Sequence, residues 1–99
     1  MRLSDEHRRI ILERTAALIG PDAKVTLFGS RVDDDRRGGD VDLLVEVPRT
    51  IDSRVKAEAL LAGTLEHALG GRRVDVLLVD PTTEAGPVHL AARAHGVAL

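Results

Sequence analysis

Residues 40–79 constrain the fold more than any other part of the chain, because their apolar pattern predicts a strand, a long helix and a second strand. Asp40–Val47 (DVDLLVEV) and Arg73–Val79 (RVDVLLV) alternate at the period of two that a strand requires. The segment between them, residues 52–69, has apolar residues at helical spacing and stops at paired glycines. A full helix is the connection that parallel strands need. We therefore expect the two strands to be parallel and to begin at the same end of one sheet.

The flanking segments predict further elements. A helix capped by Ser4 ends at Gly20 and precedes a strand over Lys24–Phe28. A short helix over Val88–His95 is followed by a tail that packs on the domain or adds a strand. The length and apolar content fit a single domain over residues 1–99. We predict an α+β fold with an α/β-like crossover, in which helices cover a small mixed β-sheet.

The same spacing indicates which helix faces should meet the core. The expected core-facing residues are Ile10, Ile11, Ala17 and Leu18 in the first helix, and Val55, Ala59, Ala62, Leu65 and Leu69 in the long one. On the last strand, Leu77 and Val79 share a face with Asp75. This face must be covered away from the carboxylate, and a helix is expected there.

Composition removes several classes of function. Phe28 is the only aromatic residue, which nearly excludes base stacking on aromatic side chains. The formal net charge is -2, without the basic stripe that binds nucleic-acid backbones, and the absence of cysteine removes disulfides and thiolate metal sites. No apolar run approaches the length of a membrane span. We expect a soluble cytoplasmic protein that has no membrane contact and is not a general nucleic-acid binder.

Two aspartates open the first strand of the crossover, and one opens the second. Asp40 and Asp42 point to the same side of a strand, with Cα atoms about 6.5–7 Å apart. Asp75 lies near the start of the expected parallel partner, which can bring all three carboxylates together. Carboxylate oxygens suit Mg²⁺, and paired ions stabilise both the attacking and the leaving oxygen of a displacement. We predict that Asp40, Asp42 and Asp75 are catalytic residues and metal ligands.

A nucleotide-binding segment is expected directly after the strand over Lys24–Phe28. If that strand is antiparallel to the next, its end meets the beginning that carries Asp40. Gly29 lets the backbone approach a ligand, and the Ser30 hydroxyl can donate to phosphate oxygens. Arg31 fits a phosphate contact as well as a surface ion pair. Nucleotidyl transfer mainly requires positioning and charge neutralisation, so no protein nucleophile is needed.

Other polar residues have simpler explanations. An Asp-x-Asp pattern alone more often faces water, and only its combination with Gly-Ser and Asp75 favours an active site. Glu46 shares the strand face of Asp42, but its Cα lies about 13 Å away. Asp80 is expected to be a turn residue. The histidines have no zinc-site spacing and are expected at the surface: His7, His67, His89 and His95.

Three segments carry a family resemblance: Leu27-Phe28-Gly29-Ser30-Arg31, Gly39-Asp40-Val41-Asp42-Leu43-Leu44-Val45 and Arg73-Val74-Asp75-Val76-Leu77. Together they resemble the signature of DNA polymerase beta-type nucleotidyltransferases, specifically the small MNT proteins, over nearly the whole chain. The resemblance implies the polymerase beta-like fold, a nucleotide triphosphate on Gly29 and Ser30, and Mg²⁺ on the three aspartates. Two departures are the glycine before Asp40, where the family commonly has serine, and the acidic run Asp33–Asp35. Neither removes an expected ligand.

The resemblance also implies a function. Many MNT proteins are antitoxins of a helical HEPN ribonuclease toxin and transfer AMP from ATP to a toxin tyrosine. The leading hypothesis is therefore a Mg²⁺-dependent protein adenylyltransferase whose acceptor is supplied by a partner or a second copy, because the chain is too short for a separate acceptor domain. One alternative is a catalytically silent antitoxin of the same fold that acts by binding, although the intact aspartates argue against it. Another is transfer to a small hydroxylated molecule such as an aminoglycoside, which is disfavoured because larger relatives need extra substrate walls.

Overall fold

The computed structural model describes residues 3–28 and 41–99. Within these residues every expected helix and strand is present, and the bounds differ from the expected ones by a residue or two. The tail forms a short fourth strand. In chain order the elements are α1 (Asp5–Leu18), β1 (Lys24–Phe28), β2 (Val41–Glu46), α2 (Arg54–Ala68), β3 (Val74–Val79), α3 (Pro87–His95) and β4 (Val97–Ala98).

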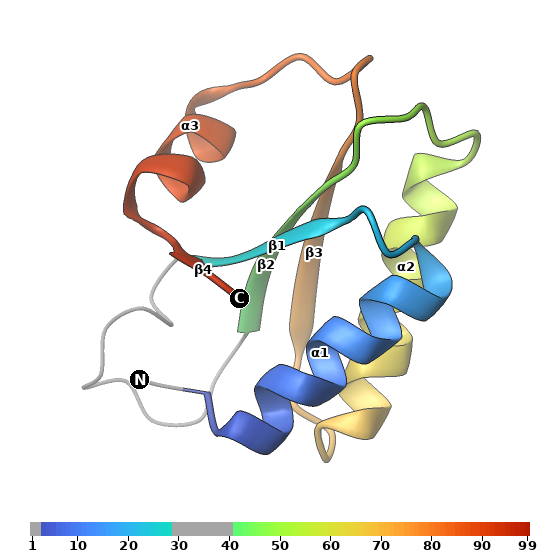
Figure 1. The fold of residues 1–99 in the computed structure, drawn as a ribbon, viewed down its shortest axis with the longest axis vertical. Coiled ribbons are helices and arrows are strands. Elements are labelled where there is room, and N and C mark those ends of the chain that lie inside the picture. The colour runs from blue at the N-terminus through green and yellow to red at the C-terminus, as the bar shows by residue number, and fades with distance from the viewer. Residues whose placement is uncertain (1–2, 29–40) are drawn as a thin grey trace.

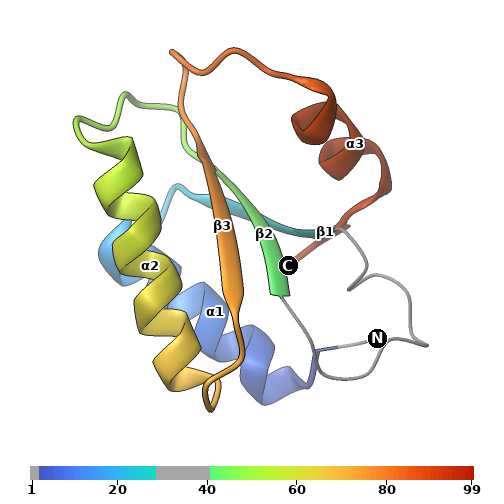
Figure 2. The ribbon, with the colours of Figure 1, turned by 180° about the vertical axis from the view of Figure 1, so that it is seen from behind.

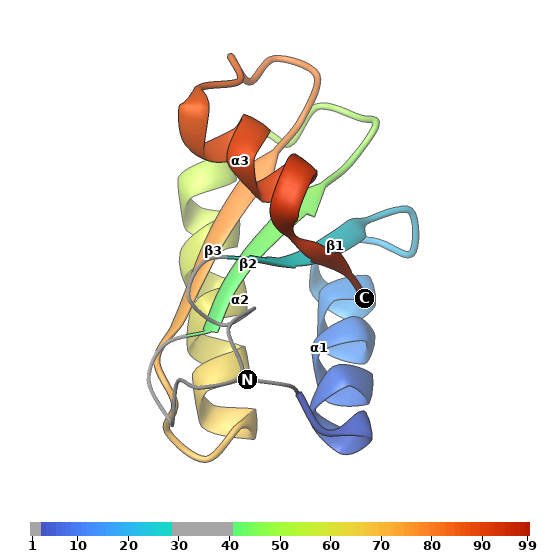
Figure 3. The same ribbon diagram turned by 90° about the vertical axis from the view of Figure 1, so that its left-hand side faces the viewer.

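The four strands form one mixed sheet in the order β3-β2-β1-β4. β2 and β3 are parallel and are joined by α2, while β1 is antiparallel to both of its neighbours. The helices α1 and α2 lie on one face of the sheet and α3 lies on the other (Figures 1 and 2). The expected α+β fold with a parallel crossover is confirmed, and Figure 3 looks onto the sheet from the side of α3, with α1 and α2 behind the strands.

Each face of the sheet has its own apolar core. The larger core lies under α1 and α2, where Val41, Leu43 and Val45 of β2 are fully buried. The smaller core lies under α3, where Leu44 packs with Val79 and Ala92. The strand alternation therefore sends apolar side chains to both sides of β2. The helix expected over the second face is α3.

The buried faces of the two helices in the larger layer match the expectation only in part. In α1 the buried residues are Ile11 and Thr15, whereas Leu18 is 40% exposed. In α2 and its C-terminal cap the expected core residues Leu65 and Leu69 are buried, but Leu61 is buried as well, and the expected core residues Val55 and Ala59 are exposed. Apolar residues occur around most of α2, so their spacing does not single out one face. Contacts with the sheet decide the orientation instead.

One such contact joins α2 to the outer edge of β3. The carboxylate of Glu58 accepts a hydrogen bond from the Leu78 backbone amide at 2.8 Å, and that of Glu66 accepts one from the Val74 amide at 3.0 Å. An edge strand has outward-facing amides that need partners, and a covered edge does not pair with another chain. The two glutamates therefore turn α2 toward β3 and hold this strand, which carries Asp75, against the domain.

The N-terminus of α1 follows the sequence expectation. The Ser4 hydroxyl accepts a hydrogen bond from the His7 backbone amide at 3.0 Å, and Asp5 and Glu6 occupy the first turn. A serine cap satisfies one of the free amides at a helix start, and acidic side chains favour the positive end of the helix dipole. The cap fixes where α1 begins and thereby which of its residues meet the sheet.

Thr15 is a buried polar residue in the middle of α1. Its side chain is 1% exposed, and its hydroxyl has no hydrogen-bond partner among the described residues. Burying an unpaired hydroxyl costs about 1–3 kcal/mol, and valine has nearly the same shape. Thr15→Val is therefore expected to raise the free energy of unfolding by about 1 kcal/mol, as measured by urea denaturation. A lower free energy of unfolding in Thr15→Val would show that the Thr15 hydroxyl makes a stabilising hydrogen bond in solution.

Candidate nucleotide site

Three residues lie in one row across the sheet. Asp42 of β2 pairs with Phe28 of β1 on one side and with Asp75 of β3 on the other. Side chains at paired positions of neighbouring strands point to the same face, and neighbouring strands are about 4.8 Å apart. The sequence prediction that Asp42 and Asp75 come together is confirmed. The row lies at the end of the sheet where β1 ends and β2 and β3 begin.

The two aspartates differ in exposure. Asp42 is half-buried between its neighbours, whereas the Asp75 side chain is 51% exposed at the edge strand. The Arg73 guanidinium lies 3.6 Å from the Asp75 carboxylate. Two carboxylates side by side repel each other, and a nearby cation reduces this repulsion. The pair therefore offers oxygen ligands at a position that solvent and a metal ion can reach.

The remaining expected site residues, Gly29, Ser30, Arg31 and Asp40, lie outside the described residues. Within residues 3–28 and 41–99, no group of three or more histidine, cysteine, aspartate or glutamate side chains could hold a metal ion. Asp42 and Asp75 together form two thirds of the expected carboxylate set. Their oxygens are the type of ligand that Mg²⁺ prefers.

Glu46 lies on the same strand face as Asp42 but is not part of this row. Its carboxylate accepts a hydrogen bond from Arg93 of α3 at 3.0 Å. Its register partner on β3 is Val79, at the far end of the strand from Asp75. The expectation that Glu46 lies apart from the aspartates is confirmed, and the ion pair with Arg93 tethers α3 over the sheet.

Asp80 has a larger role than the expected turn residue. It is only 4% exposed, and its carboxylate accepts hydrogen bonds from the Ile51 amide at 2.9 Å and from the Thr82 amide and hydroxyl at 2.9 and 2.6 Å. Arg54 at the start of α2 lies 3.5 Å away. The segment Asp80-Pro81-Thr82-Thr83 indicates the turn in the sequence, because aspartate and threonine side chains favour bonds to nearby backbone. The bond to Ile51 joins two loops that the sequence separates.

These bonds make the stability of the protein depend on pH. The hydrogen bond from the Ile51 amide, followed by that from the Thr82 hydroxyl, holds the pKa of Asp80 well below its usual value. A lowered pKa in the folded state stabilises the protein above the unfolded pKa of about 3.9, and this contribution is lost as the pH falls below that value. Asp80→Asn is therefore expected to be less stable than the wild type at pH 7. The gap should narrow between pH 4 and pH 2 in urea denaturation, and a gap that does not change with pH would contradict this prediction.

Two of the four histidines differ from the surface expectation. His7 and His89 are half-buried, while His67 and His95 are exposed. The Nδ1 atom of His89 accepts a hydrogen bond from the Gly86 amide at 2.9 Å, at the start of α3. This bond explains its position without a metal, because a helix start has amides that need acceptors.

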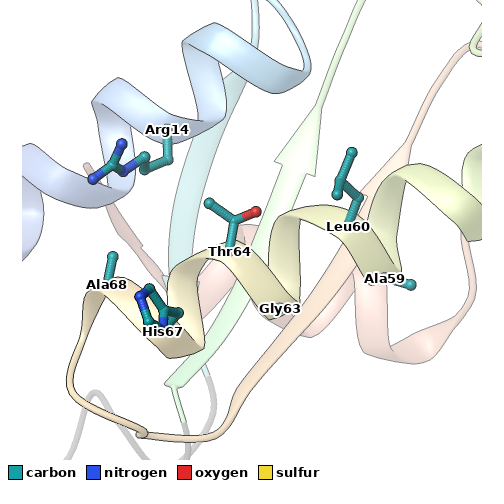
Figure 4. Close-up of a pocket in the computed structure, with 7 residues that line it drawn as sticks. All are labelled: Arg14, Ala59, Leu60, Gly63, Thr64, His67 and Ala68. Atoms are coloured by element: carbon teal, nitrogen blue, oxygen red, sulfur yellow. The ribbon is translucent and has the colours of Figure 1, made fainter.

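Two hollows in the described residues lie away from the aspartate row. One, of about 510 Å³, lies between α1 and α2 and is lined by Arg14, Leu60 and Thr64 among others (Figure 4). The other, of about 480 Å³, is lined by Leu77, His89 and residues of the loop after β3. Neither is lined by Asp42 or Asp75. The chemistry of the carboxylates, rather than the size of these hollows, marks the candidate site.

The comparison with protein families decides the class of this chain. The model of the nucleotidyltransferase domain matches residues 5–92, a range that includes the whole aspartate row. The chain belongs to the nucleotidyltransferase domain family. The parallel pair that carries Asp42 and Asp75 is thus part of a nucleotidyltransferase fold.

A solved structure extends this result. The nucleotidyltransferase is similar to MntA in a crystal structure of the MntA-HpeT toxin-antitoxin pair, with 26% sequence identity and a TM-score of 0.66. The match covers 93% of this chain and 70% of that chain. The crystallised MntA-HpeT pair is a mutant that carries glutamate in place of two aspartates that are two residues apart. A search among curated proteins found no match.

None of the helices in residues 3–28 and 41–99 has the length and apolar character that crossing a bilayer requires. The buried apolar residues of α1 and α2 pack against β1, β2 and β3.

Proposed function

We propose that this nucleotidyltransferase moves AMP from ATP to a hydroxyl of a partner protein and thereby acts as the antitoxin of a toxin-antitoxin pair. The observation that carries the proposal is the row in which Asp42 and Asp75 occupy paired positions on adjacent parallel strands. The family match supports the reaction class. The similarity to MntA, which was crystallised with HpeT as a toxin-antitoxin pair, supports a protein partner.

In this proposal Asp40, Asp42 and Asp75 hold Mg²⁺, and residues 1–99 form one catalytic domain. The fit rests on the chemistry of the donors, because Asp42 and Asp75 offer adjacent carboxylates and the spacing of Asp40 adds a third in sequence. When bound, the metal would neutralise the charge that develops on the phosphate oxygens during transfer. The two aspartates altered in the crystallised MntA-HpeT mutant have the same spacing as Asp40 and Asp42, which supports the choice of this pair.

The other residues of the proposed site bind and orient the nucleotide. Gly29 allows a close approach of the backbone, the Ser30 hydroxyl donates to a phosphate oxygen, and Arg31 adds positive charge. These residues directly follow Phe28 in the sequence, and the register partner of Phe28 is Asp42. The proposed phosphate-binding residues are therefore adjacent in sequence to a member of the aspartate row. The acceptor is a hydroxyl that the partner supplies, and we propose a tyrosine of a helical HEPN-type toxin.

The test uses ATP labelled at either the α- or the γ-phosphate. The protein, Mg²⁺ and the product of the neighbouring gene are incubated with each label, and the partner is analysed for radioactivity. Transfer from α-labelled but not from γ-labelled ATP is expected, because AMP transfer keeps the α-phosphate and releases pyrophosphate. Label from the γ-position alone would indicate a kinase. A stable complex without label would instead favour an antitoxin that acts by binding.

A further inference from the structure

Glu66 lies in the last turn of α2 and bonds to both sides of the turn that leads into β3. Its backbone carbonyl accepts a hydrogen bond from the Gly71 amide at 2.8 Å, and its carboxylate accepts one from the Val74 amide at 3.0 Å. Gly70 and Gly71 have φ angles of 77° and 90°, which glycine adopts readily and other residues do not. Two such glycines restrict the chain little, so the bonds from Glu66 are the contacts of α2 that fix where β3 begins.

The start of β3 matters because it sets the register of Asp75. In the structure Asp75 is the register partner of Asp42, while the neighbouring Val74 is buried in the core on the opposite face of the sheet. A slip of one residue turns every side chain of a strand to the other face. It would take Asp75 out of the aspartate row and into this apolar core. The bond that holds the Val74 amide therefore also keeps the Asp75 carboxylate in the row.

Glu58 makes the same kind of bond at the other end of β3, which lies beside α2 (Figure 2). Its carboxylate accepts a hydrogen bond from the Leu78 amide at 2.8 Å. The spacing explains why both bonds form, because eight residues of helix rise about 12 Å and four residues of strand extend about 13 Å. Glu58 thus holds the same strand edge three residues beyond Asp75, whereas Glu66 holds the residue directly before it.

We propose that Glu66 is a positioning residue of this site, which holds Asp75 in the register where it can share a metal ion with Asp42. The inference rests on the proposed function, since it takes the two aspartates to be metal ligands. Altering a residue that holds a metal ligand in place commonly weakens metal binding by about tenfold or more. A glutamate that only stabilised the edge of the sheet would affect the free energy of unfolding and leave the metal affinity unchanged.

The test measures the affinity for Mn²⁺ alone by calorimetry in three variants. Glu66→Met keeps a long unbranched side chain without an oxygen to accept the bond, and it should bind Mn²⁺ about tenfold more weakly than the wild type. Glu66→Gln loses the same charge but keeps an acceptor oxygen, so its affinity should stay within about twofold. Glu58→Met breaks the matching bond at Leu78 and should also stay within about twofold, because that bond is farther from Asp75. Glutamate, glutamine and methionine have similar helix propensities, so α2 itself is retained.

Hydrogen exchange shows whether each bond has been removed. The Val74 amide should exchange faster in Glu66→Met, and the Leu78 amide should exchange faster in Glu58→Met. Thermal unfolding should show a similar loss of stability in both methionine variants. An Mn²⁺ affinity that is unchanged in Glu66→Met, or that falls equally in Glu66→Gln or Glu58→Met, would overturn the inference.

Asp75→Asn tests the proposed function separately. This variant should bind Mn²⁺ more weakly than the wild type, because a charged ligand is replaced by a neutral one. A loss of affinity in Asp75→Asn with none in Glu66→Met would overturn the role of Glu66 alone. A wild type that does not bind Mn²⁺, or an Asp75→Asn variant that binds it equally well, would overturn the metal assignment of the proposed function.

Discussion

Asp42→Ala is expected to lower the rate of AMP transfer by about a thousandfold and to leave the fold intact. Asp42 stands at the centre of the row between Phe28 and Asp75, so its carboxylate is the one that can share a metal with Asp75. A thousandfold loss equals about 4 kcal/mol of transition-state stabilisation, which is a reasonable value for one ligand of a catalytic metal. The measurement is the rate of labelling from α-labelled ATP, together with the midpoint of thermal unfolding.

The thermal midpoint of this variant separates the loss of catalysis from any change in stability. Glu46→Ala is the matched control. It deletes a carboxylate from the same face of the same strand, four residues farther on and about 13 Å away, and should retain transfer. Transfer by Asp42→Ala within tenfold of the wild type would contradict the metal assignment. An equal loss in Glu46→Ala would show that the effect does not depend on the aspartate row.

The row itself follows from the sequence of two strands and the helix between them. Alternation in β2 predicts that Val41, Leu43 and Val45 share one face and that Asp42 lies on the other, and the burial of the three apolar residues confirms it. The helical connection predicts the parallel pairing with β3. A parallel pair with similar strand lengths then sets Asp42 against Asp75. The strand period and the helical connection together were enough to predict the pairing of Asp42 with Asp75.

Contacts between side chains and a distant backbone could not be predicted in this way. The Glu58 carboxylate binds the amide of Leu78, 20 residues away, and Asp80 binds the amide of Ile51, 29 residues away. No periodicity encodes such bonds, because they depend on how close the elements come after folding. The core face of α2 was predicted only in part for the same reason, since Leu65 and Leu69 are buried but Val55 is exposed. Its apolar residues allow several faces, and the bonds from β3 select one.

Gly96→Ala is expected to destabilise the protein by about 2 kcal/mol, because overpacking a filled space commonly costs 1–3 kcal/mol. Gly96 ends α3 and leads into β4, and its φ of -78° suits any residue, so backbone strain is not the cause. A Cβ atom at this position would come within 3.0 Å of the carbonyl oxygens of Ala92 and Leu27 and of the Thr26 side chain. Two of these atoms belong to backbone in α3 and β1, so one of the elements must shift.

Such a shift should loosen the pairing of β4 with β1 before it affects the parallel strands. The Leu99 amide, which donates to the Val25 carbonyl at 2.9 Å, should exchange faster with deuterium in the variant. Urea denaturation gives the loss of stability, and a 2 kcal/mol change should lower the thermal midpoint by about 10 °C in a domain of this size. Unchanged stability would show that α3 can move away without cost.

Gly63→Ala makes the same substitution in a different environment and should have the opposite sign. Gly63 lies inside α2, and a Cβ atom there would have no described atom within 4 Å. Alanine in a helix interior is more stable than glycine by about 0.5–1 kcal/mol, because the unfolded glycine chain has more freedom to lose. The two variants together separate the effect of space from that of helix propensity. If both variants have a lower free energy of unfolding, the space beside Gly63 is filled in solution. If both have a higher one, the contact between α3 and β1 at Gly96 is looser than in the structure.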